Sequence, residues 1–202
     1  MFAAIELDSE LRRRLIRLQT DIGVHEGGLR WLTPEQMHLT VKFLGEVPDD
    51  LIPAVCEALD GVAADCEPFA FQVRGVGCFP PRGSVRIVWA GLEEPTGRLR
   101  RLQAACEQVF AGLGFKQEHR SYTPHLTLAR VRNASLSSSL RAGAERNGAF
   151  AAGRQEADEI VLFESVLRRE AAQYRVVARC PFGGQSGDGG GSGLQGRLFF
   201  NR

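Results

Sequence analysis

The stretches "HLTVKF" (38–43) and "HLTLAR" (125–130) spell His-Leu-Thr followed by an aliphatic residue twice in one chain. Each lies in an apolar run that predicts a β-strand. Because side chains alternate between the two faces of a strand, the histidine and threonine of each stretch should share one face. The leucine and the next aliphatic residue should point to the other face, where the same alternation predicts that Phe43 is buried. The repeat therefore predicts two similar strands, each presenting an imidazole and a hydroxyl.

The segments around these two strands predict an α+β fold. Further strands are expected at 2–7, 68–79, 84–92, 159–168 and 173–182, and "LRWL" (29–32) is also expected to be extended. Helices are expected after Asp8 or Ser9, from Pro48, over 95–114 and around 135–147. Hairpins outnumber regular strand–helix–strand units, which favours antiparallel sheets. Because the His-Leu-Thr element occurs twice, we expect two duplicated lobes, each with helices on the outer face of its sheet.

The composition is typical of a soluble globular protein and excludes a few function classes. The 202 residues carry a formal charge of only +1, so the chain as a whole does not attract nucleic acid, and binding of any anion must come from a local cluster. Five scattered cysteines without CxxC spacing favour reduced thiols in a cytoplasmic protein over a disulfide framework or a zinc site. The apolar start is too short for a signal peptide or a membrane span, so no membrane association is expected.

The C-terminal stretch 183–202, "GGQSGDGGGSGLQGRLFFNR", differs from the rest of the chain. Glycine dominates it, and such a segment buries too little apolar surface to offset the entropy lost on ordering. We expect one domain over 1–182 and a flexible tail over 183–202.

Two histidines and two threonines that face each other suit the chemistry of phosphodiesters. One imidazole can take a proton from the attacking group while the other gives a proton to the leaving oxygen, since the pKa of histidine lies near neutrality. Threonine hydroxyls can donate to the phosphate oxygens. A metal site would need a third ligand, and Glu35 is the only acidic residue within a few positions of either histidine. We therefore expect neither a metal nor another cofactor.

Both stretches, together with their flanks, resemble the 2H phosphoesterase superfamily. The segments "RWLTPEQMHLTVKFLGEV" (30–47), "GVGCFPPRGSVRIVWAGL" (75–92) and "YTPHLTLARVR" (122–132) are similar to its RNA 2′,3′-cyclic phosphodiesterase family, formerly called 2′-5′ RNA ligases. The similarity extends over about residues 1–182. It implies a bilobal, pseudo-twofold fold with the active site in a groove between the lobes.

The resemblance also implies a reaction and a set of site residues. The reaction is hydrolysis of a 2′,3′-cyclic phosphate at an RNA end to a 2′-phosphomonoester. Nothing in the sequence suggests more than a monomer, so a monomer is expected. His125 would be the base that activates water and His38 the acid that protonates O3′, although the symmetry of the two elements does not distinguish these roles. Thr40 and Thr127 would hold the phosphate.

Four further residues near the motifs are candidates for contacts with the RNA. Arg130 is typical of the second motif and would bind substrate, but simple alternation puts it opposite His125 unless the strand bulges. Lys42 shares the expected face of His38, where it either lines the site or is a solvated lysine at a strand end. Trp31 and Tyr122 are aromatic residues on which an RNA base could stack.

Two other functions remain open at this level. The same site could run in reverse and join a 2′,3′-cyclic phosphate end to a 5′-hydroxyl end as a 2′-5′ RNA ligase. Alternatively, the chain could be a module that binds RNA ends without catalysis. Intact histidines in both elements argue against the binding module, because binding alone needs no pair of proton-transfer groups.

Overall fold

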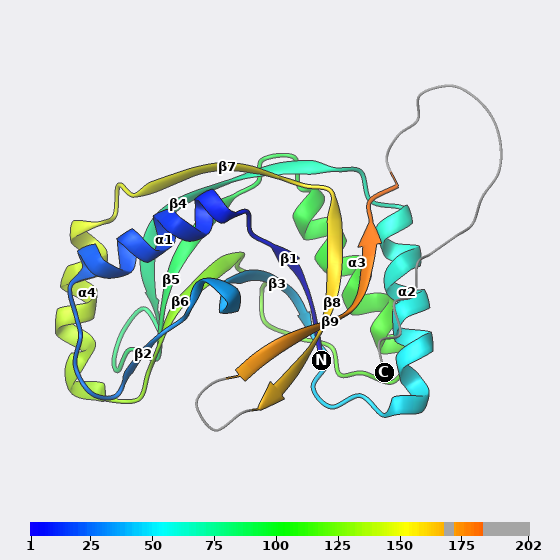
Figure 1. Cartoon of the computed structure of the whole chain (residues 1–202), viewed down its shortest axis with the longest axis horizontal. Helices are drawn as coiled ribbons and strands as arrows, with labels where there is room; N and C mark the ends of the chain where they lie inside the picture. Colours follow the sequence, from blue (N-terminus) through cyan, green and yellow to red (C-terminus); the bar gives the residue numbers. More distant parts are fainter. Residues whose placement is uncertain (168–171, 184–202) are drawn as a thin grey trace.

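The structure is a computed structural model that describes residues 1–167 and 172–183, so nearly all of the predicted tail lies outside the described residues. Its strands form one antiparallel sheet in the order β7-β4-β5-β6-β3-β1-β8-β9, with β2 paired to β6 (Figure 1). The strands are β1 (Phe2–Glu6), β2 (Leu29–Trp31), β3 (His38–Phe43), β4 (Phe69–Phe79), β5 (Ile87–Glu93), β6 (His125–Val131), β7 (Ala151–Ala157), β8 (Glu159–Leu167) and β9 (Ala172–Pro181).

The α+β class and the antiparallel pairing are confirmed, but the expectation of separate sheets in two lobes is wrong. The half formed by β1, β3, β8 and β9 joins the half formed by β4, β5, β6 and β7 through the pairing of β3 with β6. That pairing places Leu39 opposite Leu126, and both leucines are fully buried. The two motif strands are therefore neighbours at the centre of one continuous sheet.

Four helices cover one face of this sheet. They are α1 (Ser9–Ile22), α2 (Ile52–Ala64), α3 (Arg98–Gly112) and α4 (Ser137–Arg146). Helices α1 and α4 contact each other and lie against β7 and β4, whereas α2 and α3 contact each other and lie against β8, β9 and β3 (Figure 1). Their apolar side chains share one core with Leu39, Val41, Leu126 and Leu128 of the motif strands. The histidines and threonines of the motifs consequently face away from the helices.

The helices form where their sequence signals predict them. In α1 the Asp8 side chain accepts a hydrogen bond from the backbone N–H of Leu11 at 2.6 Å, and Gly23 ends the helix at a φ of 75°. Leu11, Leu15 and other residues at helical spacing are buried along one stripe. The amphipathic stripe holds α1 against the sheet.

Strand β7 is the one strand that the sequence pattern did not predict. Its sequence "AAGRQEA" contains no aromatic or β-branched residue, which are the residue types typical of strands. It is held by antiparallel pairing with β4, where Phe69 lies opposite Ala157 and Phe71 opposite Gln155. Pairing with a strong neighbouring strand outweighs its weak local preference.

All five cysteines are free, and four of them are buried. Within the described residues, no helix combines the length and the apolar character that crossing a bilayer would require.

Candidate active site

The two motifs meet across the central pairing of the sheet. Because Leu39 lies opposite Leu126 in antiparallel register, His38 lies beside Thr127 and Thr40 lies beside His125. Side chains that are directly opposite in such a pair have Cβ atoms about 4.5–5.5 Å apart. All four side chains are partly exposed on the face away from the helices, which we call the motif face. Two imidazoles and two hydroxyls from distant parts of the chain thus form one compact group.

The backbone holds the ring of His125 in a defined tautomer. Its Nδ1 lies 2.8 Å from the carbonyl oxygen of Thr123, which can only accept a hydrogen bond, so Nδ1 must donate. Phe79 of β4 meets the same ring edge to face, with ring centroids 5.1 Å apart. The other ring nitrogen, Nε2, is therefore left as the proton acceptor in the neutral imidazole.

His38 has a matching but more enclosed environment. Its ring stacks on Phe2 at 4.6 Å and meets Tyr174 of β9 edge to face at 5.2 Å. The hairpin of β8 and β9 reaches this place because the Gln36 side-chain amide donates to the carbonyl of Ala172 at 2.9 Å. The aromatic rings and the hairpin enclose His38 and leave it only partly exposed.

This enclosure changes the pKa of His38. The pKa of His38 is lowered to about 4, mainly by burial; a hydrogen bond to the backbone of Gln36 opposes this decrease, and the positive charges of Arg130 and Arg12 contribute to it. At neutral pH the unliganded protein therefore carries a neutral imidazole at position 38.

A β-bulge in each motif strand decides which residues reach the motif face. The pairing of β5 with β6 shifts between Val88 and Trp89, so Leu128 is an extra residue in β6. Leu128 and Ala129 are both fully buried, and the alternation then returns Arg130 to the motif face, where it is exposed. The sequence allowed Arg130 near the site only if the strand bulged, and the structure has that bulge.

The equivalent bulge in β3 reverses two expectations. The pairing of β1 with β3 shifts between Ala3 and Ala4, which makes Val41 the extra residue. Lys42 is consequently only 5% exposed, and its Nζ lies 2.7 Å from Glu107 Oε2 on α3, so the expectation that it lines the site is wrong. Phe43 is 62% exposed instead of buried, with its ring 5.9 Å from that of Phe2.

Neither predicted aromatic candidate for base stacking presents a free ring on the motif face. Trp31 lies opposite Ala129, which is buried on the helix side, and its Nε1 donates to the carbonyl of Val24 at 2.9 Å. Tyr122 donates its hydroxyl to the carbonyl of Thr40 at 2.9 Å, and burial raises the pKa of this phenol. Both residues brace the motif strands through these hydrogen bonds, and stacking of a base on either stays a prediction.

The structure places beside the motif residues several side chains that sequence reasoning missed. Phe2, Phe79 and Tyr174 frame the two imidazoles, and Arg30 of β2 lies directly opposite Arg130. The pairing register of strands far apart in the sequence brings them together. Arg30 carried the only local signal, since it is a charged residue within a short strand next to the first motif.

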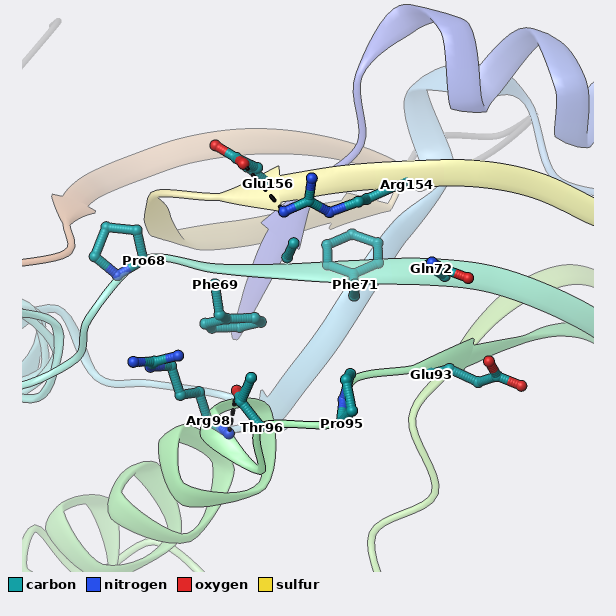
Figure 2. A pocket seen from close by; sticks show the side chains of 11 residues that line it. Pro68, Phe69, Phe71, Gln72, Glu93, Pro95, Thr96, Arg98, Arg154 and Glu156 are labelled. Carbon is teal, nitrogen blue, oxygen red and sulfur yellow. Dashed lines mark hydrogen bonds and ion pairs between the residues drawn. The ribbon is translucent and has the colours of Figure 1, made fainter.

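A cavity of about 500 Å³ lies away from the two motifs. Figure 2 shows it between β4, β7 and the start of α3, with Phe69, Arg98 and Arg154 among its lining residues. Arg98 pairs with Glu67, and Arg154 pairs with Glu156. Because both guanidinium groups are already neutralised, this cavity offers little attraction for a phosphate. The predicted groove between the lobes stays a prediction.

The described residues contain no group of three histidine, cysteine or acidic side chains placed to hold a metal ion. Independence of metal remains a prediction that an assay with a chelator can test.

Comparisons with known proteins agree on one family. The family model "LigT like Phosphoesterase" matches residues 5–89 and 91–172. An RNA 2′,3′-cyclic phosphodiesterase of Aeropyrum pernix is 30% identical over 81% of this chain and 92% of its own length. Another protein of that name, from Archaeoglobus fulgidus, is 30% identical over 87% of this chain and 96% of its own length.

Solved structures give the same answer. A crystal structure from Thermus thermophilus superposes with a TM-score of 0.77 at 26% identity, over 91% of this chain and 98% of that one. Escherichia coli LigT in complex with 3′-AMP superposes with a TM-score of 0.75 at 25% identity, over 90% of this chain and 96% of that one. With the family model matched across both motifs, this chain belongs to the LigT-like phosphoesterases of the 2H superfamily, in the family of the RNA 2′,3′-cyclic phosphodiesterases.

Proposed function

We propose that the protein hydrolyses the 2′,3′-cyclic phosphate ends of RNA to 2′-phosphomonoesters, with His38 and His125 as the acid–base pair. The observation that carries this proposal is the direct pairing of the two motif strands, which puts both imidazoles and both threonines in one group. The relatives named RNA 2′,3′-cyclic phosphodiesterase and the LigT structure with a bound nucleotide support it.

The proposed reaction uses each of the four side chains. Nε2 of His125 takes a proton from water, and the resulting hydroxide attacks phosphorus. The bond from phosphorus to O3′ then breaks, and His38 gives a proton to O3′, leaving the phosphate on O2′. The hydroxyls of Thr40 and Thr127 donate to the non-bridging oxygens as negative charge develops there. Neither hydroxyl forms a hydrogen bond with another described residue, so both are available to a substrate.

The exposed ring of Phe43 offers a place for a nucleobase. It stands on the motif face beside Phe2, three residues beyond Thr40. Stacking of a base on an aromatic side chain contributes roughly 1–3 kcal/mol. We assign to Phe43 the stacking role that the sequence suggested for Trp31 and Tyr122.

If His38 is the acid, its pKa should rise when the substrate binds. The pKa is about 4 in the free protein, so the imidazole must gain a proton when the substrate binds. A bound phosphate anion favours the charged imidazole and opposes the effects of Arg130 and Arg12. NMR titration of labelled histidine should show the pKa of His38 rising well above 4 when a nucleoside 2′-phosphate is bound. If it stays near 4 in the complex, His38 is the base and the two roles are exchanged.

Analysis of the reaction product tests the function itself. An oligonucleotide ending in a 2′,3′-cyclic phosphate is incubated with the protein in excess EDTA, and the ends are resolved by chromatography. We expect turnover to a 2′-phosphate, since the proposed chemistry needs no metal. A 3′-phosphate would contradict the assignment of O3′ as the leaving oxygen, and loss of turnover in EDTA would contradict the two-histidine mechanism.

The same assay distinguishes hydrolysis from the two other functions. When an acceptor oligonucleotide with a 5′-hydroxyl is added, hydrolysis should still dominate because water is in large excess. Joining of the two strands as the main outcome would favour the ligase, whereas tight binding without turnover would favour the RNA-end-binding module.

A further inference from the structure

The arginines in the strands of the sheet fall into two groups. The described strands contain six arginines, and four of them lie within ion-pair distance of a glutamate. The four neutralised residues are Arg74 with Glu93, Arg154 with Glu156, Arg175 with Glu164, and Arg179 with both Glu6 and Glu159. The usual arrangement in this sheet is therefore a guanidinium group with a carboxylate beside it.

Arg30 and Arg130 depart from this arrangement. They lie directly opposite each other in the pairing of β2 with β6, and both are exposed. Across residues 1–167 and 172–183, neither forms an ion pair. Like charges directly opposite each other on neighbouring strands destabilise a sheet. A ligand that brings negative charge would remove this repulsion.

Arg30 and Arg130 lie on the same face of the sheet as the proposed site. The bulge at Leu128 puts Arg130 on the same face as Thr127, three residues further along β6, which corresponds to about 7–10 Å. Arg30 shares that face because residues directly opposite in an antiparallel pair point to the same side. The distance between neighbouring phosphates of a single RNA strand is comparable to this distance between Thr127 and Arg130.

Two more exposed arginines lie in the backbone segments next to this pair. Arg86 and Arg132 are exposed, and their segments lie next to the ends of β6 and β2. The carbonyl of Arg86 accepts from the N–H of Val131 at 2.9 Å, and the N–H of Arg132 donates to Gly28 at 2.7 Å. Neither has an ion-pair partner in the part of the chain that the structure describes. The Arg30–Arg130 pair offers locally the anion attraction that a net charge of +1 does not.

We propose that Arg30 and Arg130 together bind the phosphodiester on the 5′ side of the terminal nucleotide, so that RNA strands are preferred to mononucleotides. This rests on the proposed function, since it takes the terminal phosphate to lie among the histidines and threonines. The planar guanidinium group suits two-point binding of a phosphate, and such contacts recognise the backbone whatever the base. One phosphate between two arginines would turn their repulsion into binding.

Equilibrium binding of two product ligands tests the proposal without any need for turnover. The first ligand is a nucleoside 2′-phosphate, and the second is a dinucleotide with the same terminal 2′-phosphate. Calorimetry of the wild-type protein should show the dinucleotide binding about tenfold more tightly, as expected for one charge-assisted contact. Arg30→Gln should abolish most of this ratio. For the dinucleotide, it should also reduce by about 0.7 the magnitude of the slope of log K, the binding constant, against the logarithm of the salt concentration.

Arg154→Gln is the matched control, because Arg154 is an exposed strand arginine that already has a glutamate partner. The ratio should be unchanged in this variant. The melting temperature of unliganded Arg30→Gln should equal or exceed that of the wild type, since the change removes a repulsion. A purely structural role for Arg30 would instead lower the melting temperature and weaken both ligands equally.

Two results would overturn the proposal: a wild-type protein that binds both ligands equally, or an Arg30→Gln variant that keeps the wild-type ratio. Failure of the proposed function looks different. If the protein does not hydrolyse cyclic phosphate ends but still prefers the dinucleotide in a way that depends on Arg30, the phosphate site is supported and the proposed hydrolase activity is contradicted.

Discussion

Replacing either His38 or His125 with alanine should lower kcat for hydrolysis of a 2′,3′-cyclic phosphate end by about 10²- to 10⁴-fold, which is the usual contribution of one general acid or base. Each histidine has its own role in the proposed mechanism, so neither can substitute for the other. Steady-state assays of the two single variants and the double variant measure the effect. The double variant should be little worse than either single one, because the two groups act as one unit in the same reaction and losing either removes most of the acid–base catalysis.

Both variants should stay folded, which separates loss of chemistry from loss of structure. His38 and His125 are partly exposed and lie outside the core between the sheet and the helices. His25→Ala and His119→Ala are matched controls, since both of these histidines are exposed and lie outside the motifs. The circular dichroism spectra of all four single variants should match that of the wild type. Near wild-type turnover in either motif variant would refute the acid–base pair.

The fold and the central site were accessible from the sequence because both depend on local patterns. Four helices with apolar stripes, and strands joined by hairpins, left an antiparallel α+β fold as the natural arrangement. The alternation of side chains then put histidine and threonine on one face in both motifs. What the patterns could not supply was the direct pairing of β3 with β6, because strand pairing across 87 residues depends on the packing of the whole sheet.

The errors around the site have one physical origin, the two bulges. A single extra residue reverses every later side chain in a strand, and neither Val41 nor Leu128 is a residue type that marks a bulge. Alternation therefore placed Lys42 and Phe43 on the wrong faces, whereas Arg130 was predicted correctly only under the condition of a bulge. The aromatic residues Phe2 and Tyr174 reach His38 through the pairing of β1 with β3 and β8 and of β8 with β9, which no local pattern reports.

The buried position of Lys42 leads to the largest predicted effect on stability. Its side chain is 4% exposed and that of Glu107 is 13% exposed, and Lys42 also donates to the carbonyl of Lys116 at 2.7 Å. Lys42→Ala leaves the carboxylate of Glu107 without its cation in a site with little water. Loss of one partner from a buried ion pair costs about 3–5 kcal/mol. Urea unfolding should show a decrease of this size in the free energy of unfolding.

An exposed ion pair of the same sheet supplies the control. Arg74 lies 3.4 Å from Glu93 with both side chains more than half exposed, so Arg74→Ala should cost at most about 1 kcal/mol. Replacing both buried partners, as Lys42→Met with Glu107→Leu, should recover much of the loss because no charge is left without a partner. A cost for Lys42→Ala no greater than that for Arg74→Ala would contradict the buried pair. Since Lys42 links β3 to α3 on the helix side, the double variant should keep its kcat wherever it is folded, whereas a lysine in the site would not.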